Sequence, residues 1–151
     1  AMASLADYLT DDHNHCDELF ANAENAVSER HWADAERDFA AFRAAVERHF
    51  AREETVLFPE FEQRTGMTQG PTLVMREEHD QMRAAMAALA DHLARRAGPA
   101  YLDQSDTLLM LMRQHNMKEE QVLYPMSERV LDDVGDDLIE TMRRVDPPAA
   151  T

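Results

Sequence analysis

Two stretches of the chain, HFAREETVLFP at residues 49–59 and HNMKEEQVLYP at residues 115–125, decide the fold. Six of their eleven positions are identical, and the second copy follows the first at an offset of 66 residues. The same offset places DDH at residues 11–13 opposite EEH at residues 77–79. The repeat therefore extends well beyond the two stretches, and it indicates that each half of the chain is one helical hairpin.

The sequence around these repeats is typical of long helices. It is rich in Ala, Leu, Met, Glu, Arg and Gln, which favour helix, and it shows no period-two alternation of Val and Ile. Glycines and prolines separate segments for which we expect helices over about 4–28, 32–64, 71–98 and from 99 to beyond 123, with a short one at 136–144. Because short connections make neighbouring helices antiparallel, we predict an all-α fold, an up-down-up-down antiparallel four-helix bundle built from two repeated helical hairpins. Pro59 and Pro125 are expected to kink or end their helices.

The length of 151 residues fits a single domain. We expect one domain over residues 1–151, with a core at about 5–130, a short C-terminal extension at 131–151 and a loose tail from Asp146. The formal net charge of −15 gives a surface that repels phosphate and anionic lipid headgroups. We therefore expect no nucleic-acid partner and no membrane partner, while the oligomeric state stays open.

The N-terminal residues and the cysteine content bear on location. The start, AMASLADYLTDDHN, has neither a basic segment nor an apolar segment of the kind found in secretory signals. Cys16 is the single cysteine, so an internal disulfide is excluded. These features predict a cytoplasmic protein.

The repeated stretches also place acids and imidazoles on one helical face. His49 and Glu53 are four residues apart, as are His115 and Glu119, so each pair projects side by side from its helix. The same faces carry apolar side chains: Phe42, Val46 and Leu57 in the first copy, and Leu108, Leu111 and Val122 in the second. Buried carboxylates without a partner cost several kcal/mol, roughly half of a domain's net stability. A pair of metal ions would compensate them, and imidazole with carboxylate suits iron or, less specifically, manganese or zinc.

The order His, HxxxE, His, HxxxE over about residues 5–130 resembles the hemerythrin-like family, also called the HHE cation-binding domain. The resemblance implies a non-haem di-iron centre, two iron ions joined by an oxo or hydroxo bridge. Carried over residue by residue, it implies these metal ligands: His13, His49, Glu53, His79, His115 and Glu119. Glu53 and Glu119 would bridge the two irons, and each iron would have two histidines.

One departure from the family's oxygen carriers bears on function. Those members have HxxxH on the third helix, whereas Met75 and Arg83 flank His79 at that spacing here. The missing histidine argues against reversible oxygen carriage. We expect a protein that binds dioxygen or a related small oxidant in a sensing, storage or stress-protection role. The alternative is a di-iron enzyme that removes peroxide or nitric oxide, and a metal-free bundle serving as an interaction module is a third hypothesis.

Several other polar residues leave alternatives open. Ferritin-like di-iron proteins need repeated Glu-x-x-His motifs, which this sequence lacks. His15 is the fallback ligand of the first helix, should His13 point away. Glu54 and Glu120 either orient the histidine Nδ1–H groups or are solvated acids. Tyr8 and Tyr124 either reach the metal pocket or, as is more common, pack in the core with one satisfied hydroxyl.

Overall fold

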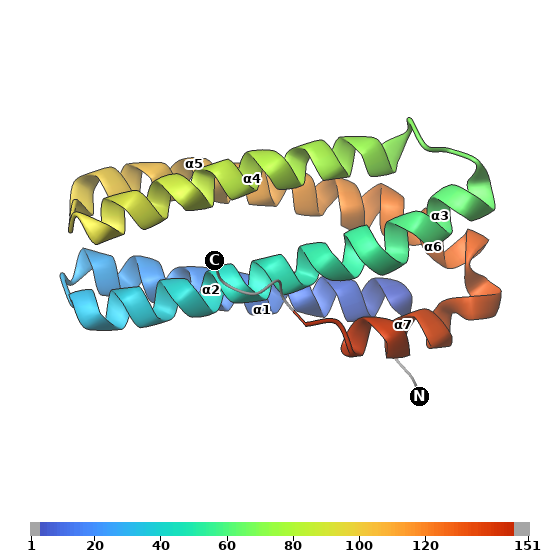
Figure 1. Cartoon of the computed structure of the whole chain (residues 1–151), viewed down its shortest axis with the longest axis horizontal. Helices are drawn as coiled ribbons and strands as arrows, with labels where there is room; N and C mark the ends of the chain where they lie inside the picture. The colour runs from blue at the N-terminus through green and yellow to red at the C-terminus, as the bar shows by residue number, and fades with distance from the viewer. Residues whose placement is uncertain (1–3, 147–151) are drawn as a thin grey trace.

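The computed structural model describes residues 4–146, and every regular element in that range is helical, which confirms the all-α prediction. The long helices are α1 (Leu5–Ser28), α2 (Trp32–Arg52), α4 (Pro71–Ala94) and α5 (Gly98–Lys118). They lie side by side along the long axis of the molecule (Figure 1), with α1 packed along α2 and α4 along α5. The loose tail that we expected lies, beyond residue 146, outside the described part of the chain. No helix in the described part carries an apolar stretch that could span a lipid bilayer.

Both halves of the chain continue beyond α2 and α5 through a π-helical turn. These continuations are η1 (Glu53–Leu57) with α3 (Phe58–Thr65), and η2 (Glu119–Leu123) with α6 (Tyr124–Val130). The expected interruptions therefore start before Pro59 and Pro125, which occupy the first turn of α3 and of α6. At that position a missing N–H removes no bond within the α-helical segment.

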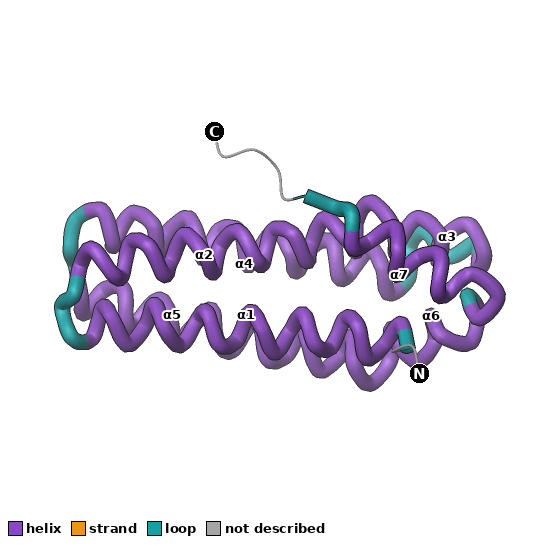
Figure 2. The backbone as a smooth tube through the Cα atoms, turned by 90° about the horizontal axis from the view of Figure 1, so that it is seen from below, coloured by secondary structure: helices purple, strands orange, loops and turns teal. Residues whose placement is uncertain are grey.

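The turns between the paired helices repeat as well. Arg30 and Arg96, which are equivalent in the two halves, both adopt positive φ, at 59° and 54°. In each turn the next residue donates its backbone N–H to a carbonyl five residues earlier, His31 to Ala26 and Ala97 to His92, both at 2.9 Å. The loops that join the long helices lie at the ends of those helices (Figure 2). The repeat found in the sequence is thus a repeat of backbone conformation.

The C-terminal residues add two short elements, η3 (Asp132–Val134) and α7 (Gly135–Arg143). Helix α7 returns along the molecule and contacts α1 and η1 (Figure 1). Its Leu138, Ile139 and Met142 are buried. Because α7 has no equivalent in the first half, it makes the two halves differ around the π turns.

Apolar side chains form two separate clusters. One, near the Arg30 and Arg96 turns, includes Phe20, Phe39, Phe42, Leu89 and Tyr101, and the other, near α7, includes Leu9, Phe58, Phe61, Leu123 and Met142. Along α1 and α4 the predicted ligand lies between members of the two clusters, and along α2–η1 and α5–η2 the predicted ligands lie where the members of one cluster end and those of the other begin. The helices therefore hold a polar layer between two apolar ones.

The prediction that Val122 belongs to the buried stripe is wrong. Val122 is 52% exposed and Leu111 is half-buried, whereas the equivalent Val56 is buried. The inward apolar position on η2 is held by Leu123, the equivalent of Leu57. Val56 is covered because α7 packs on η1, and Val122 has no such cover.

Candidate metal centre

The structure brings the six predicted ligands together in one buried cluster. Their side chains come from α1, α2, η1, α4, α5 and η2, and all are 0–3% exposed: His13, His49, Glu53, His79, His115 and Glu119. Ligand atoms of Glu53, His79, His115 and Glu119 all lie within 4.8 Å of one another, and so do those of His13, His49 and Glu119. Two groups that share a carboxylate match the arrangement expected for two metal positions.

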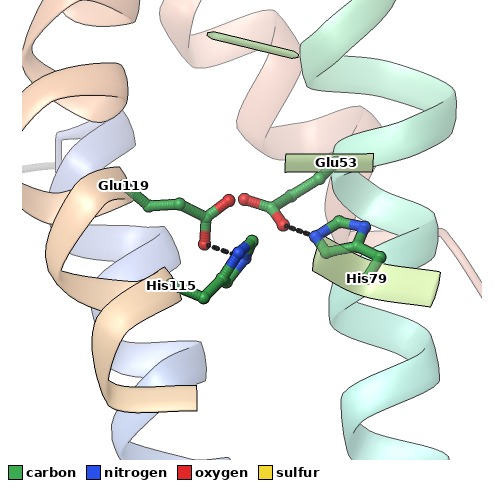
Figure 3. Close-up of side chains that lie close together, drawn as sticks. All are labelled: Glu53, His79, His115 and Glu119. Carbon is green, nitrogen blue, oxygen red and sulfur yellow. Dashed lines mark ion pairs between the residues drawn. The ribbon is translucent and has the colours of Figure 1, made fainter. Parts of the chain in front are cut away.

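The first position lies between His79 and His115. The carboxylates of Glu53 and Glu119 point toward one another here, with the two imidazoles beside them (Figure 3). Glu53 Oε1 lies 3.0 Å from His79 Nε2, and Glu119 Oε1 lies 3.1 Å from His115 Nε2. These two contacts are short but do not have the geometry of hydrogen bonds. Four buried atoms therefore have no hydrogen-bond partner: Glu53 Oε1, His79 Nε2, His115 Nε2 and Glu119 Oε2. Buried polar atoms left unsatisfied are costly, and a shared cation would satisfy all four, so the residues present fit a metal ion.

The second position lies between His13 and His49. Their Nε2 atoms are 3.1 Å apart. His13 Nε2 is 3.0 Å from Glu119 Oε1, and His49 Nε2 is 3.3 Å from Glu53 Oε1. Each of the two glutamates therefore contacts imidazoles from both positions, as a bridging carboxylate would.

Every imidazole is oriented by an acid on its Nδ1 side. His79 Nδ1 lies 2.6 Å from Glu54 Oε2, and the equivalent pair, His13 Nδ1 and Glu120 Oε2, is 2.7 Å apart. Nδ1–H donation to these carboxylates leaves Nε2 free to accept a cation. Of the two readings that the sequence allowed for Glu54 and Glu120, the geometry matches the one in which they orient histidines.

Two further acids of this kind were missed from the sequence. His49 Nδ1 is 3.1 Å from Asp12 Oδ2, and His115 Nδ1 is 2.9 Å from Glu78 Oε1. The available clue was that an acid directly precedes His13 and the equivalent histidine of the second half. The four imidazole–acid pairs obey the same repeat as the backbone.

Basic side chains form ion pairs with three of these acids. Arg52 binds Asp12 at 2.7 Å, Arg83 binds Glu54 at 3.1 Å, and Lys118 binds Glu78. Burial would raise the pKa of Glu54, but hydrogen bonds from His79 and Arg83 lower it to about 2. The acid is therefore ionised at neutral pH and strengthens the basicity of the imidazole in front of it.

The interior of the cluster favours positive charge. Burial would lower the pKa of His115, but the negative charge of Glu119 and its hydrogen bonds raise it to about 9. Burial opposes the charged form of His49 as well, yet Glu53 and the hydrogen bond to Asp12 hold its pKa well above the usual value. A site that retains protons so firmly also attracts a metal cation, which would displace them.

Comparison with protein families identifies this arrangement. A family model described as the hemerythrin HHE cation binding domain matches residues 4–127. The chain belongs to this family. Comparisons with curated proteins and with solved structures gave no match. The match includes both HxxxE motifs, and the buried His/Glu cluster is the part of this HHE domain that suits a metal cation.

The remaining histidines of the HHE domain lie away from the cluster. His15, the fallback ligand, is exposed on α1, and His31 is exposed beside α2. The positions flanking His79 at helical spacing hold a buried Met75 and an Arg83 that pairs with acids, so neither supplies a further imidazole. The role of the six clustered residues as ligands stays a prediction.

For Tyr124 of this HHE domain, the structure shows the less common of the two outcomes that the sequence left open. We expected its ring to pack in the core, and the ring is buried, but its hydroxyl reaches the centre of the cluster. The hydroxyl oxygen is 2.8 Å from Glu53 Oε2 and 3.0 Å from Glu119 Oε1. The equivalent residue of the first half is Phe58, whose ring stacks on His79 with centroids 5.7 Å apart. The single clue was this Phe-to-Tyr difference between two otherwise similar stretches.

Proposed function

We propose that the cluster holds two iron ions and that the protein binds dioxygen or a related small oxidant in a sensing, storage or stress-protection role. The proposed scaffold is an up-down-up-down four-helix bundle in which α1–α2 and α4–α5 are repeated hairpins of a single domain. A cytoplasmic location and the absence of nucleic-acid and membrane partners belong to the same proposal. The observation that carries it is the set of four unpartnered buried atoms between Glu53, His79, His115 and Glu119.

Each ligand has a defined task in this proposal. His13 and His49 would hold one iron, His79 and His115 the other, and the carboxylates of Glu53 and Glu119 would bridge them. Nitrogen and oxygen donors of this kind suit iron. Bound iron supplies open coordination positions and a reversible change of oxidation state. The chain's own acids keep the imidazoles in the tautomer that offers Nε2 to the metal.

A small cavity supports a small ligand. Its volume is about 20 Å³, and its lining includes His13, His49, Cys16, Met82 and Met112. It has room for about one water-sized molecule. Hydrocarbon and sulfur groups make up much of the wall, which suits a diatomic molecule better than an anion. The cavity is lined by His13 and His49. His79 does not line it, and the ring of Phe50 stacks on the His79 ring with centroids 3.8 Å apart.

The alternative function is a di-iron enzyme that removes peroxide or nitric oxide. Met75 and Arg83 provide no further imidazole ligand, which favours it, because a position left open at the metal can take a substrate. Both functions use the same six residues. They differ in whether the bound oxidant is consumed.

Metal loading tests the proposal. Protein loaded anaerobically with ferrous iron should contain two irons per chain by elemental analysis, in the wild type and in the matched control His15→Ala. His13→Ala, two residues away on the same helix, should retain at most one. A protein that takes up no iron, or a His13→Ala variant that loads as fully as the control, would contradict the proposal.

Adding peroxide to the loaded protein under anaerobic conditions separates the two functions. Sustained evolution of oxygen would establish the enzyme. A single spectral change with no further turnover would favour binding of the oxidant.

A further inference from the structure

The hydroxyl oxygen of Tyr124 lies within hydrogen-bond distance of four buried side chains. Besides the two carboxylates at 2.8 and 3.0 Å, it lies 3.1 Å from His13 Nε2 and 3.4 Å from His49 Nε2. The Nδ1 atoms of both histidines face acids. The Nε2 atoms, the phenol oxygen and the two carboxylates therefore point at one small volume, and the single O–H proton of the phenol can be donated to one carboxylate at a time.

These distances suit atoms that bind one metal. Two donor atoms each about 2.1 Å from a metal and at right angles to each other lie about 3.0 Å apart. The four separations from the Tyr124 oxygen, 2.8 to 3.4 Å, are close to that value. A cation placed among His13, His49 and this oxygen would displace the protons held there and bind all three donor atoms.

The two metal positions differ in this respect. At the position of His79 and His115, the equivalent aromatic residue is Phe58, which has no oxygen to offer. Its ring stacks on the His79 ring, just as the ring of Tyr124 stacks on the His13 ring with centroids 5.6 Å apart. The rings occupy equivalent places, so the hydroxyl is the one chemical difference between the two rings.

We propose that Tyr124 is a ligand of the metal held by His13 and His49, so that this position has a phenolate donor and the other position has none. The inference rests on the proposed di-metal function. When a trivalent iron binds, the O–H bond of Tyr124 breaks, the oxygen forms a bond to the metal, and the proton leaves to solvent. No oxidation state changes in this step.

Spectroscopy of the iron-loaded protein tests the proposal directly. After loading with ferrous iron and oxidation, the wild type should show a visible phenolate-to-iron charge-transfer band, and resonance Raman excitation in that band should enhance tyrosine ring vibrations. Tyr124→Phe should lose both features while keeping its helical circular dichroism. Tyr8→Phe, which removes a hydroxyl outside the cluster, should keep both.

Metal affinity gives a second measurement. In a titration against a competing chelator, Tyr124→Phe should weaken one of the two binding steps by at least about tenfold, since even the loss of an outer hydrogen-bonded partner costs that much. The other step should be unchanged.

The outcomes distinguish the two proposals. Absence of bound iron in the wild type would overturn the proposed function itself. A wild type with two irons but no tyrosine-enhanced band, or a Tyr124→Phe variant that retains it, would overturn the tyrosine ligand and leave the di-iron proposal standing.

Discussion

Replacing Glu54 by Gln tests whether the acids behind the imidazoles tune the metal site. Glu54 accepts a hydrogen bond from His79 Nδ1 at 2.6 Å and contacts the Arg83 guanidinium through both carboxylate oxygens at 3.1 Å. The amide oxygen of Gln can still accept from Nδ1–H, so the ring orientation survives. The charge does not, and the amide N–H₂ would face the donors of Arg83. We expect weaker binding of the metal held by His79.

The expected magnitude follows from the role of Glu54 as an outer partner of a ligand. Loss of such a partner typically costs about 10–100-fold in metal affinity, which corresponds to about 1.4–2.8 kcal/mol. Because Glu54→Gln removes a charge and also creates a clash of donors, we expect an effect near 100-fold for one binding step. The step that involves His13 and His49 should change little, because its imidazoles are oriented by Glu120 and Asp12.

The assay is a competitive titration with a chelator, and Glu47→Gln is the matched control. Glu47 also accepts from Arg83, at 3.0 Å, and its side chain is 22% exposed against 23% for Glu54, but it contacts no histidine. Both variants lose one charge and one contact to the same arginine. Equal losses of affinity in the two variants would refute the reasoning, because the effect would then come from Arg83 or from net charge.

Three further predictions concern the scaffold. Met142→Ala should lower the free energy of unfolding by about 2–5 kcal/mol in urea titrations with unchanged metal stoichiometry, because Met142 is fully buried on the inner side of α7. Gly66→Ala should destabilise the protein by about 1 kcal/mol, because Gly66 has a φ of +73°. Gly135→Ala should stabilise it by about 0.4–1 kcal/mol, because Gly135 has a φ of −55° and an added Cβ would enter open space. Thermal melts in which both variants shift in the same direction would contradict this contrast. Burial raises the pKa of the Cys16 thiol to about 11. Alkylation of the folded protein should therefore be slow at pH 8 and should become about tenfold faster with each pH unit up to that pKa. Alkylation of the protein unfolded in urea should be fast. Rapid labelling of the folded protein at pH 8 would disprove the buried thiol.

The convergence of six polar side chains could be predicted because it depends on two simple periodicities. A spacing of four residues puts His49 and Glu53 on one helical face, and the 66-residue repeat supplies the equivalent pair. The repeat also singled out His13 over His15, and the structure places the first in the cluster and the second in solvent. Local spacing and internal symmetry were sufficient for this part of the site.

What the sequence did not provide depends on the helical phase and on contacts between the halves. Val122 is exposed because α7 covers the equivalent Val56 and leaves Val122 without cover, and α-helical periodicity does not predict the π turns that hold both residues. The partner of each imidazole lies on another helix, as with His49 and Asp12, so its identity depends on how the helices pack. The reach of the Tyr124 hydroxyl is likewise a result of the fold.

The two π turns carry a consequence for how this chain can change in length. Each adds one residue relative to an α-helix, and each begins at a glutamate of the cluster, at Glu53 and at Glu119. Deleting a single residue inside either turn would therefore give a continuous α-helix and leave the facing of α3 or α6 unchanged, whereas the same deletion within α2 or α5 would rotate everything after it by about 100° about the helix axis. In that second case the apolar side of α3 or α6 would face water. Gaps between related sequences should therefore fall in the 66–70 loop or in these five-residue turns and spare α2 and α5.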